Sequence, residues 1–283
     1  MAEFKHFILN LRGTLREFSS PAVMGIINVT TDPFYKESRA FDAHSIEKRA
    51  KDMIADGADI LDVGACSTRP GAKIVSEEEE LIHITNAVRI IRDLSAEIPV
   101  SVDTFRAKVA EAAVAEGADI INDISGGDLD EDMFPTAAKL KVPYILMHTR
   151  GTPETMSSLT DYGERGVTAT VLDNLGYKMN RLALMGVNDI IIDPGFGFAK
   201  NLDQNYELMR NLDVFNELDA PILVGISRKR MATNLLEITA EDALDATVAL
   251  NCFALDRGAS IIRVHDVLPA VQAVKIFNKI NNL

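Results

Sequence analysis

The strongest constraint on the fold is a pattern that occurs eight times along the chain: a short apolar run, then a longer stretch with helical spacing. The apolar runs, such as DIIID and PILVG, are continuous, which is typical of parallel strands covered by helices. Between them, apolar residues recur three and four positions apart, as in Ile46, Ala50 and Met53. The predicted strands span residues 23–30, 58–65, 99–104, 118–125, 142–148, 189–195, 220–227 and 259–265.

Eight strand-helix units in 283 residues predict a (β/α)8 TIM barrel, an α/β fold. Similar segments at 56–65, 116–125 and 257–266 support a repeated architecture, since each places a Gly-Ala pair before a strand that ends in polar residues. An open doubly wound sheet is the alternative, but it would normally carry a GxGxxG turn after an early strand, and none is present. We expect residues 1–20 to form a strand or hairpin packed on the barrel, and 21–283 to form the barrel domain.

Composition restricts the partners and the compartment. A net charge of −13 argues against sequence-independent binding of nucleic acid, and no apolar run reaches the roughly 20 residues that cross a bilayer. The two cysteines form no CxxC pair, and the first residues lack a signal-peptide arrangement. These features predict a protein of the reducing cytoplasm. Cys252 lies in an apolar segment, so we expect it in the core.

Polar residues collect where the predicted strands end, which in a TIM barrel is the catalytic face. One group offers hydrogen-bond donors and acceptors suited to the edge of a flat, nitrogen-rich heterocycle. A second group suits a phosphate or diphosphate, because arginine presents a rigid fork of donors and an asparagine carbonyl can bind Mg²⁺. The first group is Asp103, Asn122, Asp193 and Lys229; the second is Asn28, Arg69, Arg263 and His265.

At these residues the sequence resembles the dihydropteroate synthase family. The resemblance runs from Met24 to Asp266, and its motifs follow one another in the family's order. They are MGIINVTTDPF at 24–34, DVGACSTRPG at 62–71, SVDT at 101–104, INDI at 121–124, MH at 147–148, DPGFGF at 193–198, SRK at 227–229 and RVHD at 263–266.

The resemblance implies a transferase of folate biosynthesis that condenses 6-hydroxymethyl-7,8-dihydropterin diphosphate with p-aminobenzoate to 7,8-dihydropteroate and diphosphate. It also implies that the protein is a target of sulfonamides, with Mg²⁺ at Asn28 and catalytic roles for Asp103, Lys229, Arg263 and His265. The pterin would be bound by Asp103, Asn122, Met147, Asp193, Phe198 and Lys229. The diphosphate and p-aminobenzoate would be bound by Asn28, Asp32, Phe34, Ser67, Thr68, Arg69, Pro70, Ser227, Arg263 and His265.

The sequence departs from the family's pattern at three places near the expected p-aminobenzoate pocket. Cys66 stands where glutamate is common, Pro33 belongs to TTDPF where TPDSF is usual, and Arg230 follows SRK where serine is frequent. An arginine there can serve a carboxylate at least as well electrostatically. We expect these changes to affect the p-aminobenzoate pocket more than the pterin pocket.

Two other functions remain open at this stage. A pterin-binding methyltransferase would need no diphosphate clamp, so Arg69, Arg263 and His265 argue against it. A catalytically idle paralogue that binds pterin or a partner protein is motivated by the altered positions 31–34 and 66. The apolar helix expected at 239–257 is a candidate surface for a homodimer. We expect His148 to bind a backbone group rather than line the pocket.

Overall fold

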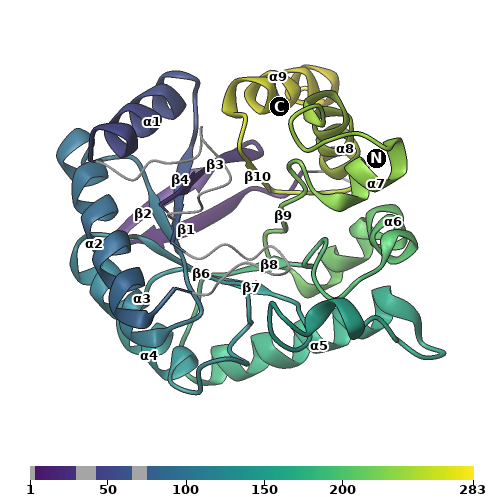
Figure 1. Ribbon diagram of the computed structural model, residues 1–283, viewed down its shortest axis with the longest axis horizontal. Helices are drawn as coiled ribbons and strands as arrows, with labels where there is room; N and C mark the ends of the chain where they lie inside the picture. The colour runs from purple at the N-terminus through teal and green to yellow at the C-terminus, as the bar shows by residue number, and fades with distance from the viewer. Residues whose placement is uncertain (1–3, 30–42, 66–74) are drawn as a thin grey trace.

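The computed structural model describes residues 4–29, 43–65 and 75–283. A barrel of parallel strands is enclosed by helices (Figure 1), which confirms the predicted TIM barrel. The strands are β3 (Ala22–Asn28), β4 (Ile60–Gly64), β5 (Val100–Asp103), β6 (Ile120–Asp123), β7 (Tyr144–Met147), β8 (Ile190–Asp193), β9 (Leu223–Val224) and β10 (Ile261–Val264). The helices are α1 (Ala43–Ala55), α2 (Glu77–Leu94), α3 (Ala107–Ala115), α4 (Met133–Leu140), α5 (Gly166–Leu184), α6 (Leu202–Arg210), α7 (Arg230–Leu236), α8 (Leu244–Asp256) and α9 (Val267–Asn281).

The strand order is β8-β7-β6-β5-β4-β3-β10-β9, and every pair is parallel. The barrel closes between β8 and β9 through the Ile192–Ile222 bridge, next to a bond from the Ile192 amide to the Pro221 carbonyl (2.9 Å). The strand predicted over 220–227 is thus reduced to two residues. Pro221 has no N–H to donate, and the chain turns after Val224 towards α7.

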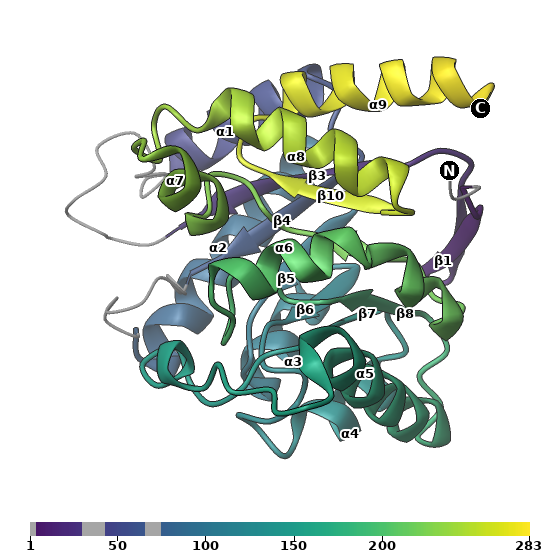
Figure 2. The same cartoon turned by 90° about the vertical axis from the view of Figure 1, so that its right-hand side faces the viewer.

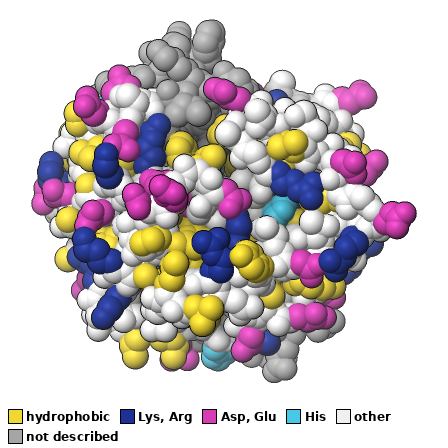
Figure 3. Space-filling view, turned by 90° about the horizontal axis from the view of Figure 1, so that it is seen from below, with side chains coloured by type: hydrophobic (Ala, Val, Ile, Leu, Met, Phe, Trp, Pro, Cys, Tyr) yellow, Lys and Arg dark blue, Asp and Glu magenta, His cyan; other side chains and the backbone are white. Residues whose placement is uncertain are grey.

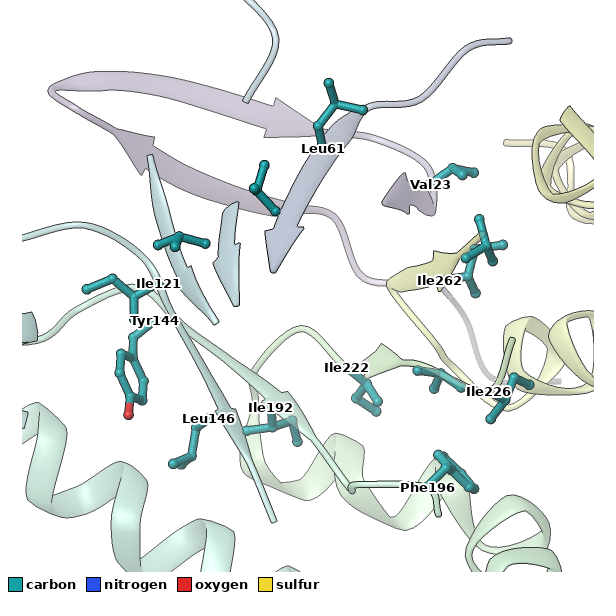
Figure 4. Close-up of a cluster of buried hydrophobic side chains, with 14 of the residues drawn as sticks. Val23, Leu61, Ile121, Tyr144, Leu146, Ile192, Phe196, Ile222, Ile226 and Ile262 are labelled. Carbon is teal, nitrogen blue, oxygen red and sulfur yellow. The ribbon is translucent and has the colours of Figure 1, made fainter. Parts of the chain in front are cut away.

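The outward faces of the strands form the main core with the helices. Aliphatic side chains such as Val23, Leu61 and Ile121 point away from the barrel axis, and Tyr144 and Phe196 are fully buried among them (Figure 4). Apolar side chains also fill the opposite, inner faces of the strands at their amino ends, so both faces are covered. The continuous apolar runs in the sequence reflect this double burial.

An antiparallel hairpin, β1 (Phe7–Leu11) and β2 (Thr14–Phe18), precedes the barrel. Phe7 stacks on Phe18 with ring centroids 4.7 Å apart, and both pack on inward-facing residues such as Met24 and Ile120. The hairpin therefore closes the amino end of the barrel, at the opposite end from α7 (Figure 2), as its position in the sequence suggested.

The expectation that Cys252 is a core residue is wrong. Cys252 and Phe253 are exposed on α8, whose opposite side packs on the barrel through Leu250 and Ala254. The segment is apolar on nearly all sides, so its sequence pattern does not indicate which side is buried.

None of the helices in the described residues is both long and apolar enough to span a bilayer. Basic and acidic side chains are interspersed on the face lined by α4 and α5 (Figure 3).

Candidate active site

A charged cluster lies at the carboxyl ends of the barrel strands. The register of the sheet sets Gly64 opposite Asp103 and Asp103 opposite Asn122. Asp103 is only 8% exposed and Asn122 only 3%. Gly64 leaves room for Asp103, because a Cβ at this position would lie 3.2 Å from the Cβ of Asp103, a tight contact. Neighbouring strands therefore place these two polar side chains side by side.

Arg263 connects the cluster across the barrel. Its Nε donates to Asp62 Oδ2 and its Nη2 donates to Asp103 Oδ2, each at 2.6 Å. Asn122 donates to the same Asp62 oxygen at 3.1 Å. Burial lowers the pKa of Arg263, but the attraction of Asp62 and Asp103 more than offsets this and leaves it raised. Arg263 is thus a permanent cation held by two buried carboxylates.

Asp62 is a member of this cluster to which the sequence analysis gave no role. It begins the DVGACSTRPG motif at 62–71, is completely buried, and accepts hydrogen bonds from both Arg263 and Asn122. Among the residues that the structure describes, its second oxygen, Oδ1, is buried without a hydrogen-bond partner, as is the hydroxyl of Ser101 at the facing strand position. The sequence feature that could have indicated Asp62 is the DVGA segment, which it begins. In the sheet, Asp62 pairs with Ser101 of the neighbouring strand.

Asp193 and Lys229 lie beside this cluster. Lys229 Nζ donates to the Phe196 carbonyl at 2.7 Å and sits 4.7 Å from the centroid of the Phe198 ring. Burial lowers the pKa of Lys229 to about 8, and the nearby Asp193 carboxylate opposes that shift. Burial raises the pKa of Asp193, an effect that Lys229 opposes. The two residues interact electrostatically at one site.

Asp103 titrates at an unusual pH for a carboxyl group. Burial raises its pKa to about 7; the charge of Arg263 opposes this shift, and Asp62 adds to it. A carboxyl group with such a pKa can exchange a proton with a bound heterocycle near neutral pH. The cluster therefore offers an acceptor, a cation and an amide to a flat ligand.

His265 and Ser227 form a second group at the same end of the barrel. The backbone amide of His265 donates to Ser227 Oγ at 3.2 Å, and His265 Nδ1 lies 3.0 Å from the same oxygen. Arg228, between Ser227 and Lys229, pairs with Asp266 at 2.8 and 2.9 Å. This ion pair connects the segment before α7 to the end of β10, and the sequence reasoning did not assign Arg228 that role.

The remaining predicted residues divide into two sets. Met147 and Phe198 are buried together with Ile124 and Met156 next to the cluster. Asn28 ends β3 and is partly exposed. Several predictions fall outside the described residues, namely Asp32, Pro33, Phe34, Cys66, Ser67, Thr68, Arg69 and Pro70.

The expectation for His148 is incomplete, because a lysine is a further partner of its side chain. The side chain is buried and lies next to Tyr162, and its Nδ1 is 3.1 Å from the Lys200 ammonium. A hydrogen bond to its own backbone also acts on the imidazole and raises its pKa against the effect of burial. Sequence alone did not indicate that Lys200, 52 residues further on, lies against the end of β7.

Comparison with known proteins identifies the family. The model of pterin binding enzymes matches residues 24–265. A dihydropteroate synthase of Clostridium beijerinckii is 42% identical over 257 residues, covering 90% of this chain and 92% of the relative. The chain belongs to the dihydropteroate synthase family of pterin-binding enzymes. Like its relatives in that family, it is a transferase of folate synthesis.

Solved dihydropteroate synthases share the fold over almost the whole length. A Yersinia pestis dihydropteroate synthase in complex with a sulfonamide drug superposes with a TM-score of 0.91 at 35% identity, covering 98% of this chain and 100% of the other. A Xanthomonas albilineans dihydropteroate synthase with 4-aminobenzoic acid superposes with a TM-score of 0.88 at 34% identity, covering 98% of each chain. The dihydropteroate synthase fold thus includes the hairpin as well as the barrel.

Proposed function

We propose that this dihydropteroate synthase joins 6-hydroxymethyl-7,8-dihydropterin diphosphate to p-aminobenzoate through the residues of the cluster. The observation that carries the proposal is the arrangement of Arg263 between Asp62 and Asp103, with Asn122 on the same carboxylate. This arrangement supports binding of a pterin by its polar edge, since buried polar groups reject ligands that lack matching groups.

In the reaction, the bond between the pterin methylene carbon and the diphosphate oxygen breaks, and its electron pair leaves with the diphosphate. The amine nitrogen of p-aminobenzoate uses its lone pair to form the new C–N bond and then releases a proton. The pterin ring supports the positive charge that develops on the methylene. Asp103 and Asp193 favour that charge, and the enclosed position of the cluster strengthens their effect. An arylamine is already nucleophilic at neutral pH, so no strong base is required.

Arg263 and His265 favour the departing diphosphate. The hydrogen bonds of Arg263 to the two carboxylates use Nε and Nη2, and within the described residues Nη1 has no partner and is available to an anion. If Ser227 donates to Nδ1 of His265, the imidazole carries its proton on Nε2 and can donate it to a phosphate oxygen. Both residues come from the end of β10.

The residues present fit a Mg²⁺ ion that arrives with the substrate. Asn28 would supply one amide oxygen, and Mg²⁺ commonly combines one or two protein oxygens with substrate phosphates and water. Residues 4–29, 43–65 and 75–283 contain no group of three His, Cys, Asp or Glu side chains that would hold a metal by themselves. When bound, the ion would neutralise charge on the leaving diphosphate.

Two further properties belong to the proposal. A homodimer would bury Phe253 on α8 and Ile276 on α9, which are 62% and 61% exposed on helices that pack together. The free thiol of Cys252 on the same surface suits the reducing cytoplasm. We also propose that sulfonamides compete with p-aminobenzoate, as the drug complex of the Yersinia pestis relative suggests.

The experiment that tests the function measures diphosphate release with both substrates and Mg²⁺. We expect diphosphate and 7,8-dihydropteroate in equal amounts, and release that depends on p-aminobenzoate. Folded protein that binds pterin in a calorimeter without releasing diphosphate would instead be an idle paralogue. Methyl transfer from methyltetrahydrofolate without diphosphate release would indicate the methyltransferase.

A further inference from the structure

The segment of residues 194–199, which follows β8, is held by side chains from several elements. The Phe196 carbonyl accepts from Lys229 (2.7 Å), and the Gly197 amide donates to Asn205 Oδ1 of α6 (2.6 Å). The Ala199 carbonyl accepts from the Tyr162 hydroxyl at 3.0 Å. Side chains from three other parts of the chain therefore bind this irregular backbone.

Lys200 makes the central contacts. Its Nζ donates to the carbonyls of Gly195 and Phe198, each at 2.9 Å, and lies 3.1 Å from His148 Nδ1. An ammonium group has three N–H bonds, so these three acceptors satisfy it completely. Lys200 is only 8% exposed, so it has few other partners available.

The protonation states of the neighbours suit this arrangement. Burial lowers the pKa of His148 to about 2, with a further contribution from the charge of Lys200, so the imidazole is neutral and Nδ1 can accept. Burial also lowers the pKa of Lys200 to about 7, an effect that Asp193 opposes. The charge of Lys200 therefore depends on Asp193, its nearest acidic influence.

Lys200 binds the backbone of a residue that is itself hydrogen-bonded to Asp193 and Phe198, two residues predicted to bind the pterin. The Gly195 amide donates to Asp193 Oδ1 at 2.7 Å, so the orientation of Gly195 determines that of the carboxylate. Phe198 donates its amide to the Gly195 carbonyl (3.2 Å), the same carbonyl that Lys200 binds. Gly195 has φ +73°, and a Cβ there would lie 2.0 Å from the His148 carbonyl oxygen. The segment therefore lies directly against the end of β7.

We propose that Lys200 is a positioning residue that holds residues 194–199 in the conformation in which Asp193 and Phe198 meet the pterin. It acts through the backbone and touches no substrate. The inference rests on the proposed function, because it takes the pterin as the ligand of Asp193. Without the ammonium, the Gly195 and Phe198 carbonyls would be left buried and unpaired, and the segment would shift to reach water.

The test uses Lys200→Met and titrates 6-hydroxymethylpterin, a ligand without diphosphate, by calorimetry. We expect binding to weaken by about tenfold or more, which is the effect of losing a hydrogen bond to a charged group. Hydrogen exchange at the Gly195 and Gly197 amides should become faster. Lys200→Gln keeps two N–H donors on a shorter side chain and should give an intermediate affinity.

Lys178→Met is the matched control. Lys178 is another buried lysine, with a side chain 5% exposed that pairs with Asp128 at 2.7 Å, and it makes no hydrogen bond to residues 194–199. This variant should lose thermal stability but keep its pterin affinity and the exchange rates of Gly195 and Gly197.

Several results would overturn the proposal. Lys200→Met with lower thermal stability but the pterin affinity of the unchanged protein would make Lys200 merely structural. If Lys200→Met does not fold, Lys200→Gln decides, and unchanged affinity there would contradict the inference. Failure of the unchanged protein itself to bind pterin would refute the proposed function as well, so the two failures are distinguishable.

Discussion

Arg263 Nη2 lies 2.6 Å from Asp103 Oδ2, although 160 positions separate the two residues in the chain. Arg263 comes from β10 and Asp103 from β5, and the strands β3 and β4 lie between these two strands in the sheet. With Asp62 on β4 as a second anchor, the guanidinium spans the barrel interior at its carboxyl end. Its position thus depends on two carboxylates that are buried with it.

Asp62→Asn should lower kcat/KM for diphosphate release. The asparagine keeps an oxygen for Arg263 Nε but removes the charge, and a hydrogen bond to a charged group contributes about 1.5 to 3 kcal/mol. We expect a loss of roughly 10- to 100-fold in steady-state assays. The control is Asp59→Asn, which alters a carboxylate bonded to the Val23 amide at the other end of the barrel. Equal losses in both variants would contradict a specific role for Asp62.

Pterin affinity should pass through a maximum near pH 7. The Asp103 carboxylate is present above its pKa of about 7 and is lost as the pH falls through that value. The ammonium groups of Lys200 and Lys229 are present below their pKa values of about 7 and about 8 and are lost as the pH rises through those values. Calorimetry from pH 5.5 to 9.5 measures the acidic and the alkaline fall in affinity. Because these groups interact, the two apparent pKa values describe the cluster rather than single residues. Asp103→Asn should abolish the acidic fall, and affinity independent of pH in the unchanged protein would refute the assignment.

Gly195→Ala should destabilise the fold more than Gly163→Ala. Both glycines have positive φ, +73° and +58°, so each alanine pays about 1 to 2 kcal/mol for the left-handed backbone. A Cβ at Gly163 meets nothing within 4 Å, whereas one at Gly195 would lie 2.0 Å from the His148 carbonyl oxygen. We expect an additional loss of roughly 2 kcal/mol in the free energy of unfolding, measured with urea. Similar losses would show that the contact with β7 relaxes easily.

Phe253→Glu should convert a homodimer into monomers. The side chain is 62% exposed on α8, and a carboxylate placed in an apolar interface would have to be desolvated. Sedimentation velocity at micromolar concentration measures the change. Leu15→Glu is the control, because Leu15 is 72% exposed on the hairpin, away from α8. A protein that is monomeric before substitution would refute the dimer.

The periodic features of the fold were predictable from the sequence. Strand positions followed from continuous apolar runs, and the alignment of strand ends in a barrel was enough to bring Asp103, Asn122 and Arg263 together. The first residues were expected to form a strand or hairpin, and the structure forms a hairpin that turns at Arg12 and Gly13, both of which have positive φ.

Contacts between side chains of distant segments were not predictable. Lys200 is an ordinary charged residue in a loop until the fold places His148 beside it. Asp62 is one polar strand end among many until Arg263 reaches it from β10. Cys252 was assigned to the wrong side of its helix, because α8 lacks a polar face that would indicate its orientation.

The aromatic pair Phe7 and Phe18 lies at the amino end of the barrel, and the charged cluster lies at the carboxyl end. Substitutions in the hairpin would therefore change how many molecules are folded without changing the turnover of each folded molecule. Thermal stability and catalytic turnover thus depend on residues at opposite ends of this barrel, so either property can be altered while the other is preserved.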